Sequence, residues 1–408
     1  MNDGAPPGAG RALSEAAAAA IVVTPASLAA SDRASRNAAI TLGMTLPGDT
    51  VLYLLLPLHV AAFDVTLPEA GLLLAANRLV RIAGYGWVAR GYERLGPRTV
   101  CLVAALGAAA STLGYALLSG VWLLLIARLI WGLSFAALNI ATQALATQEA
   151  VRAARRNGRA RAIIAAGPML GLLAGAVLAE LTEPRAVFLV LATVALLALP
   201  VAALLPRGRG RAVLTPRSRF GLPTSLDTWS FVQGLTLDGV FVVGLAVLAS
   251  AASPEGATLA AGAALALRYA AEIALGPPGG IVAERCGTVR LLVLLSLGSA
   301  AGLALISAGY LWTGVIAIVL LRGMLQPLPA PVAAAANPGP RRVPAIARLA
   351  TWRGLGAGTG PLLAGIVLPL APSVLYAGGA IALAGTTLAL AMTIRLPAAT
   401  ARGTDRSR

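Results

Sequence analysis

The residues most able to do chemistry in this chain are ionisable side chains inside long apolar segments. Asp49, Arg128, Asp238 and Arg322 each lie in such a segment. A charged group at the centre of a bilayer costs about 2.5–3.5 kcal/mol on insertion scales, so it normally faces a cavity, has a partner or has a function. A buried carboxylate whose solvation and arginine partner change between two conformations can bind and release a proton. These residues therefore indicate proton coupling.

The same acid and arginine recur in each half of the chain. Asp49 and Asp238 lie in the first apolar segment of their halves, 189 residues apart, and Arg128 and Arg322 lie in the fourth, 194 apart. We predict two carboxylate–arginine pairs, Asp49–Arg128 and Asp238–Arg322, with Asp49 as the proton carrier. The alternative is a static pair that only holds helices together. The Pro47–Gly48 dipeptide is expected to kink its helix beside the carboxylate.

A second group of polar residues lies on the second apolar segment of each half. Arg78 and Arg81 are three residues apart and so share one helix face with Asn77 close by. Guanidinium groups bind carboxylate or phosphate bidentately, so this pair indicates an anionic ligand. The alternative is pairing with backbone carbonyls or lipid headgroups. Arg268 and Glu272 form an i,i+4 pair able to neutralise itself, and all five residues are candidates for substrate binding.

The composition determines which elements position these residues. Of the 408 residues 58% are apolar and 12% are charged, about half of the roughly 25% charge of a soluble domain. A soluble enzyme is therefore excluded, and an all-α integral membrane protein with twelve transmembrane helices in two pseudo-symmetric six-helix halves is predicted. One helix needs about 20 apolar residues, and such segments lie near 37–63, 68–89, 99–119, 121–147, 162–182, 186–205, 226–252, 257–281, 291–309, 311–334, 350–369 and 373–394.

Arginine placement predicts the orientation. The chain has 32 basic residues, all of them arginine, and a net charge of +16. Twenty-five of the 32 lie in the terminal segments and in alternate inter-helix segments, and such segments are cytoplasmic in membrane proteins. Both termini of this multi-pass protein are therefore expected on the cytoplasmic side of the inner (cytoplasmic) membrane.

We predict a mobile cytoplasmic tail over 1–36, a six-helix bundle over 37–205, a cytoplasmic linker over 206–225, a second six-helix bundle over 226–394 and a cytoplasmic tail over 395–408. Asp227 and Arg353 lie closer to the ends of their segments and are expected to be structural.

Short motifs recur at matching places in the two halves. The second segments end in GWVARGYERLG (86–96) and GPPGGIVAERCG (276–287), and the fifth and eleventh contain GPMLG (167–171) and GPLLAG (360–365). The fourth segment carries RLIWGLSFA from Arg128. In this order, on twelve helices in two halves, the motifs resemble those of the major facilitator superfamily, and the chain is most similar to its twelve-helix drug/proton antiporter type.

This resemblance implies roles for two further sets of residues. The loop motif implies a conformational latch; the alternative is that its charges only set the topology. The residues of the implied latch are Glu93, Arg94, Gly96, Gly280, Glu284, Arg285 and Gly287. The motif of the fifth and eleventh helices implies a part in antiport, for which the alternative is close helix packing; it comprises Gly167, Pro168, Gly171, Gly360 and Pro361. Glu284 replaces the usual Asp, Ala89 and Pro97 depart from the first copy of the loop motif, and Ile163 replaces a glycine upstream of Gly167.

The sequence therefore predicts a secondary transporter that moves a small molecule by alternating access. Proton-coupled efflux is implied by the resemblance, and proton-coupled uptake or exchange of a small organic anion is the alternative indicated by Arg78 and Arg81. A single histidine, His59, and the absence of a nucleotide-binding loop argue against an enzyme and against ATP-driven transport. The expected partners are a small-molecule substrate, protons and the lipid bilayer. No cofactor, metal or nucleic acid is expected, and the chain is expected to be a monomer.

Overall fold

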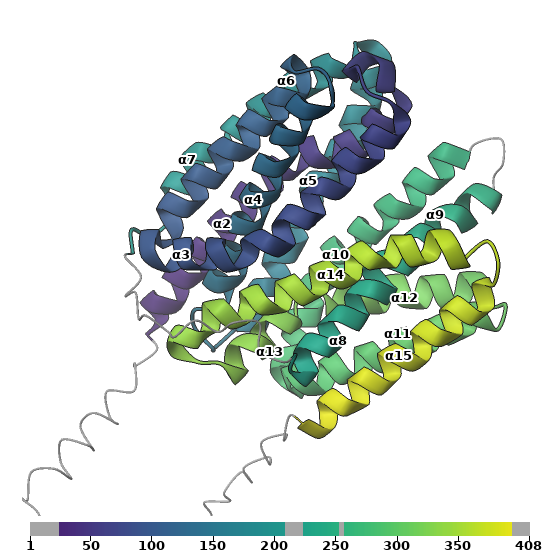
Figure 1. Cartoon of the computed structure of the whole chain (residues 1–408). Coiled ribbons are helices and arrows are strands. Elements are labelled where there is room, and N and C mark those ends of the chain that lie inside the picture. Colours follow the sequence, from purple (N-terminus) through teal and green to yellow (C-terminus); the bar gives the residue numbers. More distant parts are fainter. Residues whose placement is uncertain (1–23, 209–222, 253–256, 394–408) are drawn as a thin grey trace, which may run out of the picture.

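The computed structural model describes residues 24–208, 223–252 and 257–393, and all regular secondary structure within them is helical. The helices form two bundles, one from each half of the chain (Figure 1). The N-terminal bundle contains α2 (Pro25–Leu58), η1 (Val60–Phe63), α3 (Leu67–Leu117), α4 (Val121–Ala146), α5 (Ala153–Leu181), α6 (Pro184–Leu196) and α7 (Ala198–Ala203). The C-terminal bundle contains α8 (Ser225–Gln233), η2 (Gly234–Val240), α9 (Phe241–Ala252), α10 (Ala257–Cys286), α11 (Thr288–Ser307), α12 (Leu311–Leu325), α13 (Pro329–Ala336), η4 (Gly339–Arg341), α14 (Arg342–Val367) and α15 (Pro372–Thr393).

These elements provide the twelve predicted membrane passes. Nine helices of the described residues are long and apolar enough to cross a bilayer, and one of them, Pro68–Leu117, has 50 residues. That helix is broken at Gly96, whose φ of 79° lies in the left-handed region, and so makes two passes. With α10 and α14, which carry charged residues within their length, the count is twelve. The all-α prediction is confirmed.

The first helix starts earlier than predicted. Residues 25–36, expected in a mobile tail, form the first three turns of α2. The Thr24 side chain accepts a hydrogen bond from the backbone N–H of Ser27 at 3.1 Å, and Pro25 fits the first helical position. The rest of that predicted tail, most of the predicted linker 206–225 and the tail 395–408 lie outside the described residues.

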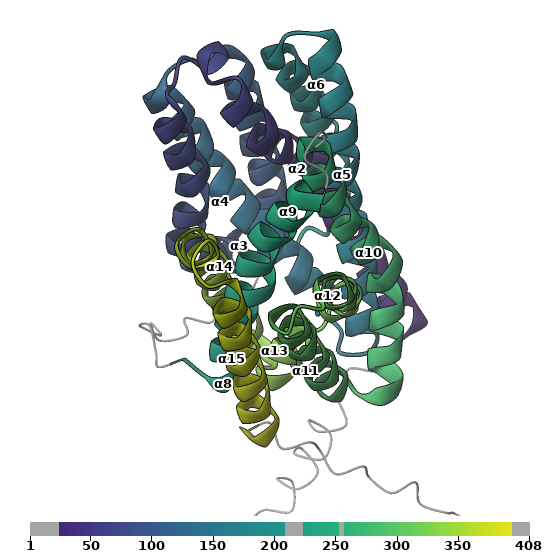
Figure 2. The same ribbon diagram turned by 90° about the vertical axis from the view of Figure 1, so that its right-hand side faces the viewer.

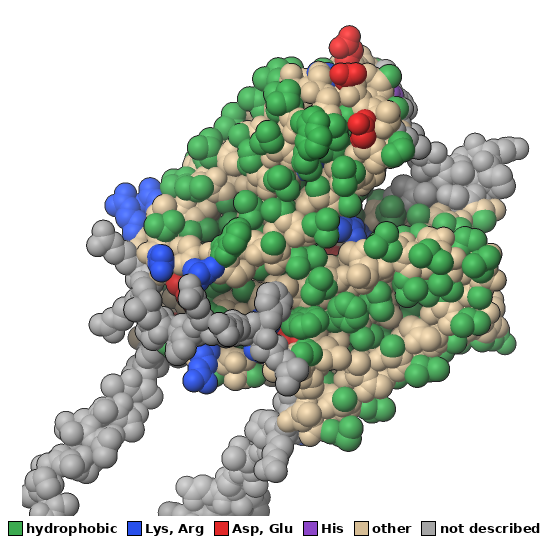
Figure 3. Space-filling view, in the orientation of Figure 1, with side chains coloured by type: hydrophobic (Ala, Val, Ile, Leu, Met, Phe, Trp, Pro, Cys, Tyr) green, Lys and Arg blue, Asp and Glu red, His purple; other side chains and the backbone are tan. Residues whose placement is uncertain are grey.

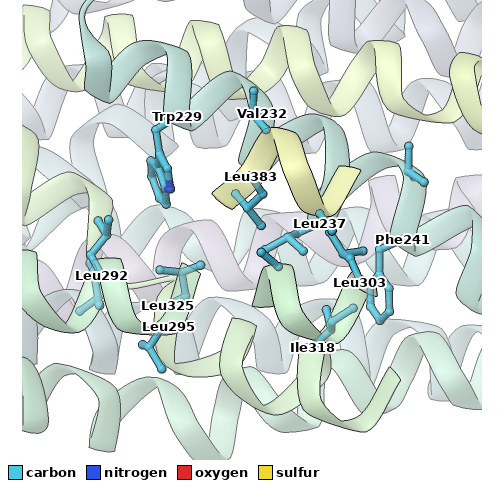
Figure 4. Close-up of a cluster of buried hydrophobic side chains, with 14 of the residues drawn as sticks. Trp229, Val232, Leu237, Phe241, Leu292, Leu295, Leu303, Ile318, Leu325 and Leu383 are labelled. Atoms are coloured by element: carbon cyan, nitrogen blue, oxygen red, sulfur yellow. The ribbon is translucent and has the colours of Figure 1, made fainter. Parts of the chain in front are cut away.

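Each bundle has an apolar interior and an apolar exterior. In the C-terminal bundle, Trp229, Phe241, Leu292, Ile318 and Leu383 are buried in one cluster contributed by five helices (Figure 4). Large apolar side chains also cover the outside of both bundles (Figure 3). Soluble monomers rarely expose apolar patches of this extent, so the lateral surface suits contact with lipid.

The two bundles contact each other at one end and separate at the other. The contacts join α5 to α10 and α3 to α14, which lie side by side in the view of Figure 2. Gly158 and Gly276 allow the first pair of helices to approach closely, because a Cβ on Gly158 would collide with the backbone of Gly276. Toward the other end, the surface is hollowed between the bundles, and basic side chains are visible there (Figure 3).

Candidate functional site

Asp49 of α2 lies at the centre of a charge cluster in the N-terminal bundle. It forms an ion pair with Arg128 of α4, which is fully buried. Asn77 Nδ2 donates a hydrogen bond to Asp49 Oδ1 at 3.1 Å, and Arg81 Nη2 lies 3.7 Å from Oδ2. The structure therefore brings together Asp49 and Arg128 as predicted, and adds two residues predicted to bind substrate.

Several groups hold Arg128 in place. Its Nε donates to the carbonyl oxygen of Leu73 at 3.0 Å, and its Nη1 lies 3.4 Å from the Tyr115 hydroxyl. The guanidinium lies over the ring of Tyr53, 5.2 Å from the centroid. Arg81 is less enclosed, since 18% of its side chain is exposed. Arg128 is thus the fixed partner of Asp49, and Arg81 is the partner nearer the solvent.

Helix packing positions Asp49. α2 continues from Pro25 to Leu58 as one helix through Pro47, so the predicted kink does not interrupt it. Pro47 packs against Gly171 of α5, and Gly48 packs against Thr112 of α3. These close contacts on either side of α2 orient the carboxylate toward α3 and α4.

Asp238 is the corresponding acid of the C-terminal bundle. It lies in η2, a π-helical segment of the kind often found at functional sites. Arg322 donates to Asp238 Oδ1 from Nη2 at 2.6 Å and from Nε at 3.0 Å. Arg353 Nε donates to Oδ2 at 2.8 Å. The predicted pair is present. Arg353, expected to be structural because it lies closer to the end of its segment, completes the arginine clamp on this carboxylate.

Glu272 joins the same cluster by a route that the sequence did not indicate. Arg322 Nη1 donates to Glu272 Oε1 at 2.6 Å. The expected self-neutralising pair of Arg268 with Glu272 is not formed, and the Arg268 guanidinium lies instead over the ring of Tyr269, 4.9 Å from its centroid. Arg322 thus lies between Glu272 and Asp238 and donates to both.

Arg161 connects the two bundles. It belongs to α5, yet its Nη2 lies 3.7 Å from Glu272 Oε2 and donates to Gln326 Oε1 at 3.2 Å, both in the C-terminal bundle. Arg78 also crosses the interface, since its Nη1 donates to the carbonyl oxygen of Ala357 at 2.6 Å. The bundles are therefore joined by charged groups as well as by apolar packing.

The central charge network carries a surplus of positive charge. We define it as Asp49, Arg78, Arg81, Arg128, Arg161, Asp238, Arg268, Glu272, Arg322 and Arg353. Its seven arginines face three acids, so several arginines share one carboxylate and the network has a net charge of +4. Arg81, Arg161 and Arg353 of this network come from three different helices, α3, α5 and α14.

Two members of this network, Arg161 and Arg353, were not among the predicted site residues. The repeat contains the signal that identifies them. Gly167-Pro168 of α5 corresponds to Gly360-Pro361 of α14, and Arg161 precedes the first glycine by six residues and Arg353 the second by seven. Both arginines lie near the predicted ends of their segments, where arginines are typical of topology or structural roles.

The residues of the implied latch behave differently in the two halves. Glu284 crosses the interface, with Oε2 lying 3.5 Å from Arg155 Nε and Oε1 accepting a hydrogen bond from the Arg155 N–H at 3.3 Å. Gly280 packs against the backbone of Ala154 and Arg155, and Gly287, at φ 92°, caps α11. Within the described part of the chain, Glu93, Arg94 and Arg285 form no ion pair, and Gly96 forms the break in α3.

The glycines of the fifth and eleventh helices lie at close helix contacts. A Cβ on Gly167 would collide with the backbone of Gly43 in α2, and one on Gly171 would meet Pro47. In the other bundle, Gly360 packs against the backbone of Leu235 and Gly239. Pro168 and Pro361 follow the first glycine of each motif inside α5 and α14. Packing gives these residues a physical role, and a part in antiport stays a prediction.

The chain was compared with protein families, with curated proteins and with solved structures. The sequence model of the Major Facilitator Superfamily matches residues 38–253. The structure is similar to that of the human organic anion transporter MFSD10 (TETRAN), with a TM-score of 0.73, 15% identity, and coverage of 88% of this chain and 99% of that one. It is also similar to the proton:xylose symporter XylE bound to 6-bromo-6-deoxy-D-glucose, with a TM-score of 0.70, 16% identity and coverage of 88% and 95%. No curated protein sequence matches the chain.

At these identities the two structural likenesses show a shared fold, and the sequence match shows the family. That match spans more than half of the chain and includes Asp49, Arg128 and Asp238. Together with the two helical bundles and the buried charges between them, it shows that this multi-pass membrane protein is a secondary transporter of the major facilitator superfamily.

Proposed function

We propose that this protein carries a small organic anion across the cytoplasmic membrane together with protons. The observation that carries the proposal is the surplus of four positive charges in the central charge network. Net charge away from water is costly unless it is compensated, and an anionic substrate would compensate part of this surplus. The recess between the bundles gives this substrate a route to the network (Figure 3).

Arg81, Arg161 and Arg353 are the groups best placed to receive the anion. Their side chains are 18%, 21% and 24% exposed, whereas those of Arg128 and Arg322 are 0% and 6% exposed. The buried Nε of Arg161 has no hydrogen-bond partner among the described residues. An anion between these arginines contacts both bundles at once. Such a contact biases the carrier toward conformations in which the bundles are close together.

Proton coupling follows from the two partners of Asp49. Protonation of Asp49 removes the negative charge that faces Arg81 across 3.7 Å, and so leaves Arg81 available to the substrate. An anion on Arg81 in turn weakens the hold of that arginine on Asp49. Proton and anion therefore favour each other's binding, and linkage makes this effect reciprocal. Such cooperation is the property of a symporter, which under an inward proton gradient takes the anion up.

Proton-coupled efflux is the second candidate. It is supported by the GPMLG motif at 167–171, which resembles that of drug/proton antiporters. In an antiporter the proton and the substrate compete for the site. The sign of the pH effect on substrate binding therefore separates the two candidates.

The test uses purified protein in proteoliposomes with radiolabelled benzenesulfonate, an anion that stays ionised over the pH range used. We expect accumulation inside when the outside is made acidic, and no transport of tetraethylammonium. Arg81→Gln should weaken benzenesulfonate binding about 10- to 100-fold, because a hydrogen bond to a charged group contributes about 1.5–3 kcal/mol. Arg290→Gln, an exposed arginine of α11, is the control for loss of one positive charge. Transport of the cation instead of the anion would contradict the proposal, and expulsion of preloaded anion by external acid would select the efflux candidate.

A further inference from the structure

A small cavity lies at the end of the N-terminal bundle, away from the central charge network. It lies between α2 and α5 and has a volume of about 150 Å³. A single water needs only about 10–15 Å³ of such space, so a phosphate group fits. Its lining consists of Asp32, Arg33, Ser35, Arg36, Arg156, Arg159, Ala160 and Ile163.

The charges of this cavity are not balanced. Asp32 is engaged by Arg156, whose Nη1 lies 3.5 Å from Asp32 Oδ1. Arg156 is itself fixed, since its Nε donates to the carbonyl oxygen of Ala146 at 2.9 Å. Arg33, Arg36 and Arg159 have exposed side chains and no ion pair within the described residues. Three guanidinium groups therefore face this cavity without an anion.

A buried hydroxyl of the cavity also has no partner. Ser35 is 2% exposed, and its Oγ makes no hydrogen bond within the described residues. A buried polar group without a partner costs about 1–3 kcal/mol. A phosphate oxygen is a strong acceptor that satisfies this hydroxyl and the arginines together.

The cavity lies at the depth of lipid headgroups. α2 has 34 residues, about 51 Å at 1.5 Å per residue, whereas the hydrocarbon core is about 30 Å thick. After Arg36 the only charged residue of α2 is Asp49, and after Arg161 no charged residue follows in α5 before Glu180. The arginines therefore mark the boundary of the apolar region, and Ala160 and Ile163 form the apolar side of the cavity. Basic side chains gather at this end of the molecule, where α2 begins (Figure 3).

We propose that this cavity binds the phosphate of an anionic phospholipid in the leaflet that the arginine distribution identifies as cytoplasmic. The phosphate lies between Arg36 and Arg159 and accepts a hydrogen bond from the Ser35 hydroxyl. The glycerol and acyl chains lie along Ile163. A lipid of net negative charge is favoured over a zwitterionic one, because a choline ammonium would be repelled by the three arginines. Bound lipid joins α2, the helix that carries Asp49, to α5. Basic pockets between helices on the cytoplasmic side bind anionic headgroups in this manner.

The test is native mass spectrometry of the full chain in mild detergent, titrated with palmitoyl-oleoyl-phosphatidylglycerol or with the matching phosphatidylcholine. We expect phosphatidylglycerol to bind at least tenfold more tightly. The double variant Arg36→Gln/Arg159→Gln should lose about 25-fold in this affinity, since each arginine near the surface contributes about 1 kcal/mol, or fivefold. Arg285→Gln/Arg290→Gln removes two exposed arginines at the matching end of the C-terminal bundle and should leave the affinity within about twofold.

Ser35→Ala provides a variant that changes no charge. It should weaken phosphatidylglycerol binding several-fold without lowering the melting temperature in phosphatidylcholine, because it removes a buried hydroxyl that has no partner among the described residues. Equal affinity of the two double variants would overturn the proposal, as would equal binding of the two lipids. If 10 mM inorganic phosphate displaces phosphatidylglycerol completely, the cavity is a site for soluble phosphate and the lipid assignment is wrong. None of these measurements depends on transport, so they are independent of the proposed function.

Discussion

Asp49 and Asp238 occupy corresponding positions, but their arginines hold them differently. Both oxygens of Asp238 accept hydrogen bonds from arginine, at 2.6 Å from Arg322 and 2.8 Å from Arg353. The Oδ2 atom of Asp49 faces Arg81 at 3.7 Å, beyond hydrogen-bond distance. One acid is thus fully engaged and the other has an oxygen that can accept a proton. This difference favours Asp49 as the coupling residue.

Asp49→Asn should separate substrate binding from proton coupling. The amide resembles the protonated acid, so we expect benzenesulfonate to bind at pH 8 as tightly as it binds the unaltered protein at pH 6. The pH-driven accumulation of the anion should be lost. Asp64→Asn is the control, because Asp64 lies outside the network in a left-handed conformation that asparagine tolerates. Binding that still tightens between pH 8 and pH 6 in Asp49→Asn would exclude this residue as the proton carrier.

The amino-acid sequence predicts some contacts of the central charge network and not others. The sequence predicts the pairs Asp49–Arg128 and Asp238–Arg322 for two reasons. Each residue is a charge within an apolar segment, and the same acid and arginine occur at corresponding positions of both halves. The contact of Glu272 with Arg322 could not be predicted from the sequence. The two residues lie on different helices, and the i,i+4 spacing of Glu272 from Arg268 gives no information about an arginine 2.6 Å away on α12. Spacing along one helix describes that helix alone, and a cluster between helices depends on how they are rotated against each other.

Among the elements, α14 shows how glycine placement determines helix contacts. Gly360 faces the backbone of η2, whereas Gly365, one and a half turns further on, has open space where a Cβ would lie. The order and class of the helices follow from runs of about 20 apolar residues, and twelve passes are predicted for this reason. The break at Gly96 and the early start of α2 at Pro25 depend on backbone conformation and capping at single residues.

The two glycines of α14 make a matched pair for testing this packing. Gly360→Ala should destabilise the protein by about 1–3 kcal/mol, as overpacking of a close contact does. Gly365→Ala should change stability by less than about 1 kcal/mol, because nothing lies near the added methyl group. Thermal unfolding of both variants in the same detergent measures the difference. Equal melting temperatures would mean that η2 moves aside without cost and that Gly360 is not needed for packing.

For the whole molecule, the contacts between the bundles define the conformation. Contacts between α5 and α10 close the end that the arginines predict to be cytoplasmic, and the recess opens at the other end (Figures 1 and 3). With that orientation the structure is outward-facing. The interface combines close packing at glycines with the Arg155–Glu284 ion pair, so both packing and electrostatic attraction stabilise the contact between the bundles.

The contribution of charge can be measured through the one exposed native thiol. Cys286 is exposed and Cys101 is buried, so a spin label on Cys286 and another on Ala150→Cys report the separation of the bundles across the closed end. Glu284→Gln should raise the ratio of open to closed molecules about 1.4- to 5-fold, because a partly exposed ion pair contributes about 0.2–1 kcal/mol. Arg285→Gln, next in sequence but without an ion pair among the described residues, should leave the distance distribution unchanged. If both variants leave it unchanged, the Arg155–Glu284 pair does not hold this end closed, and Glu284 is not a latch.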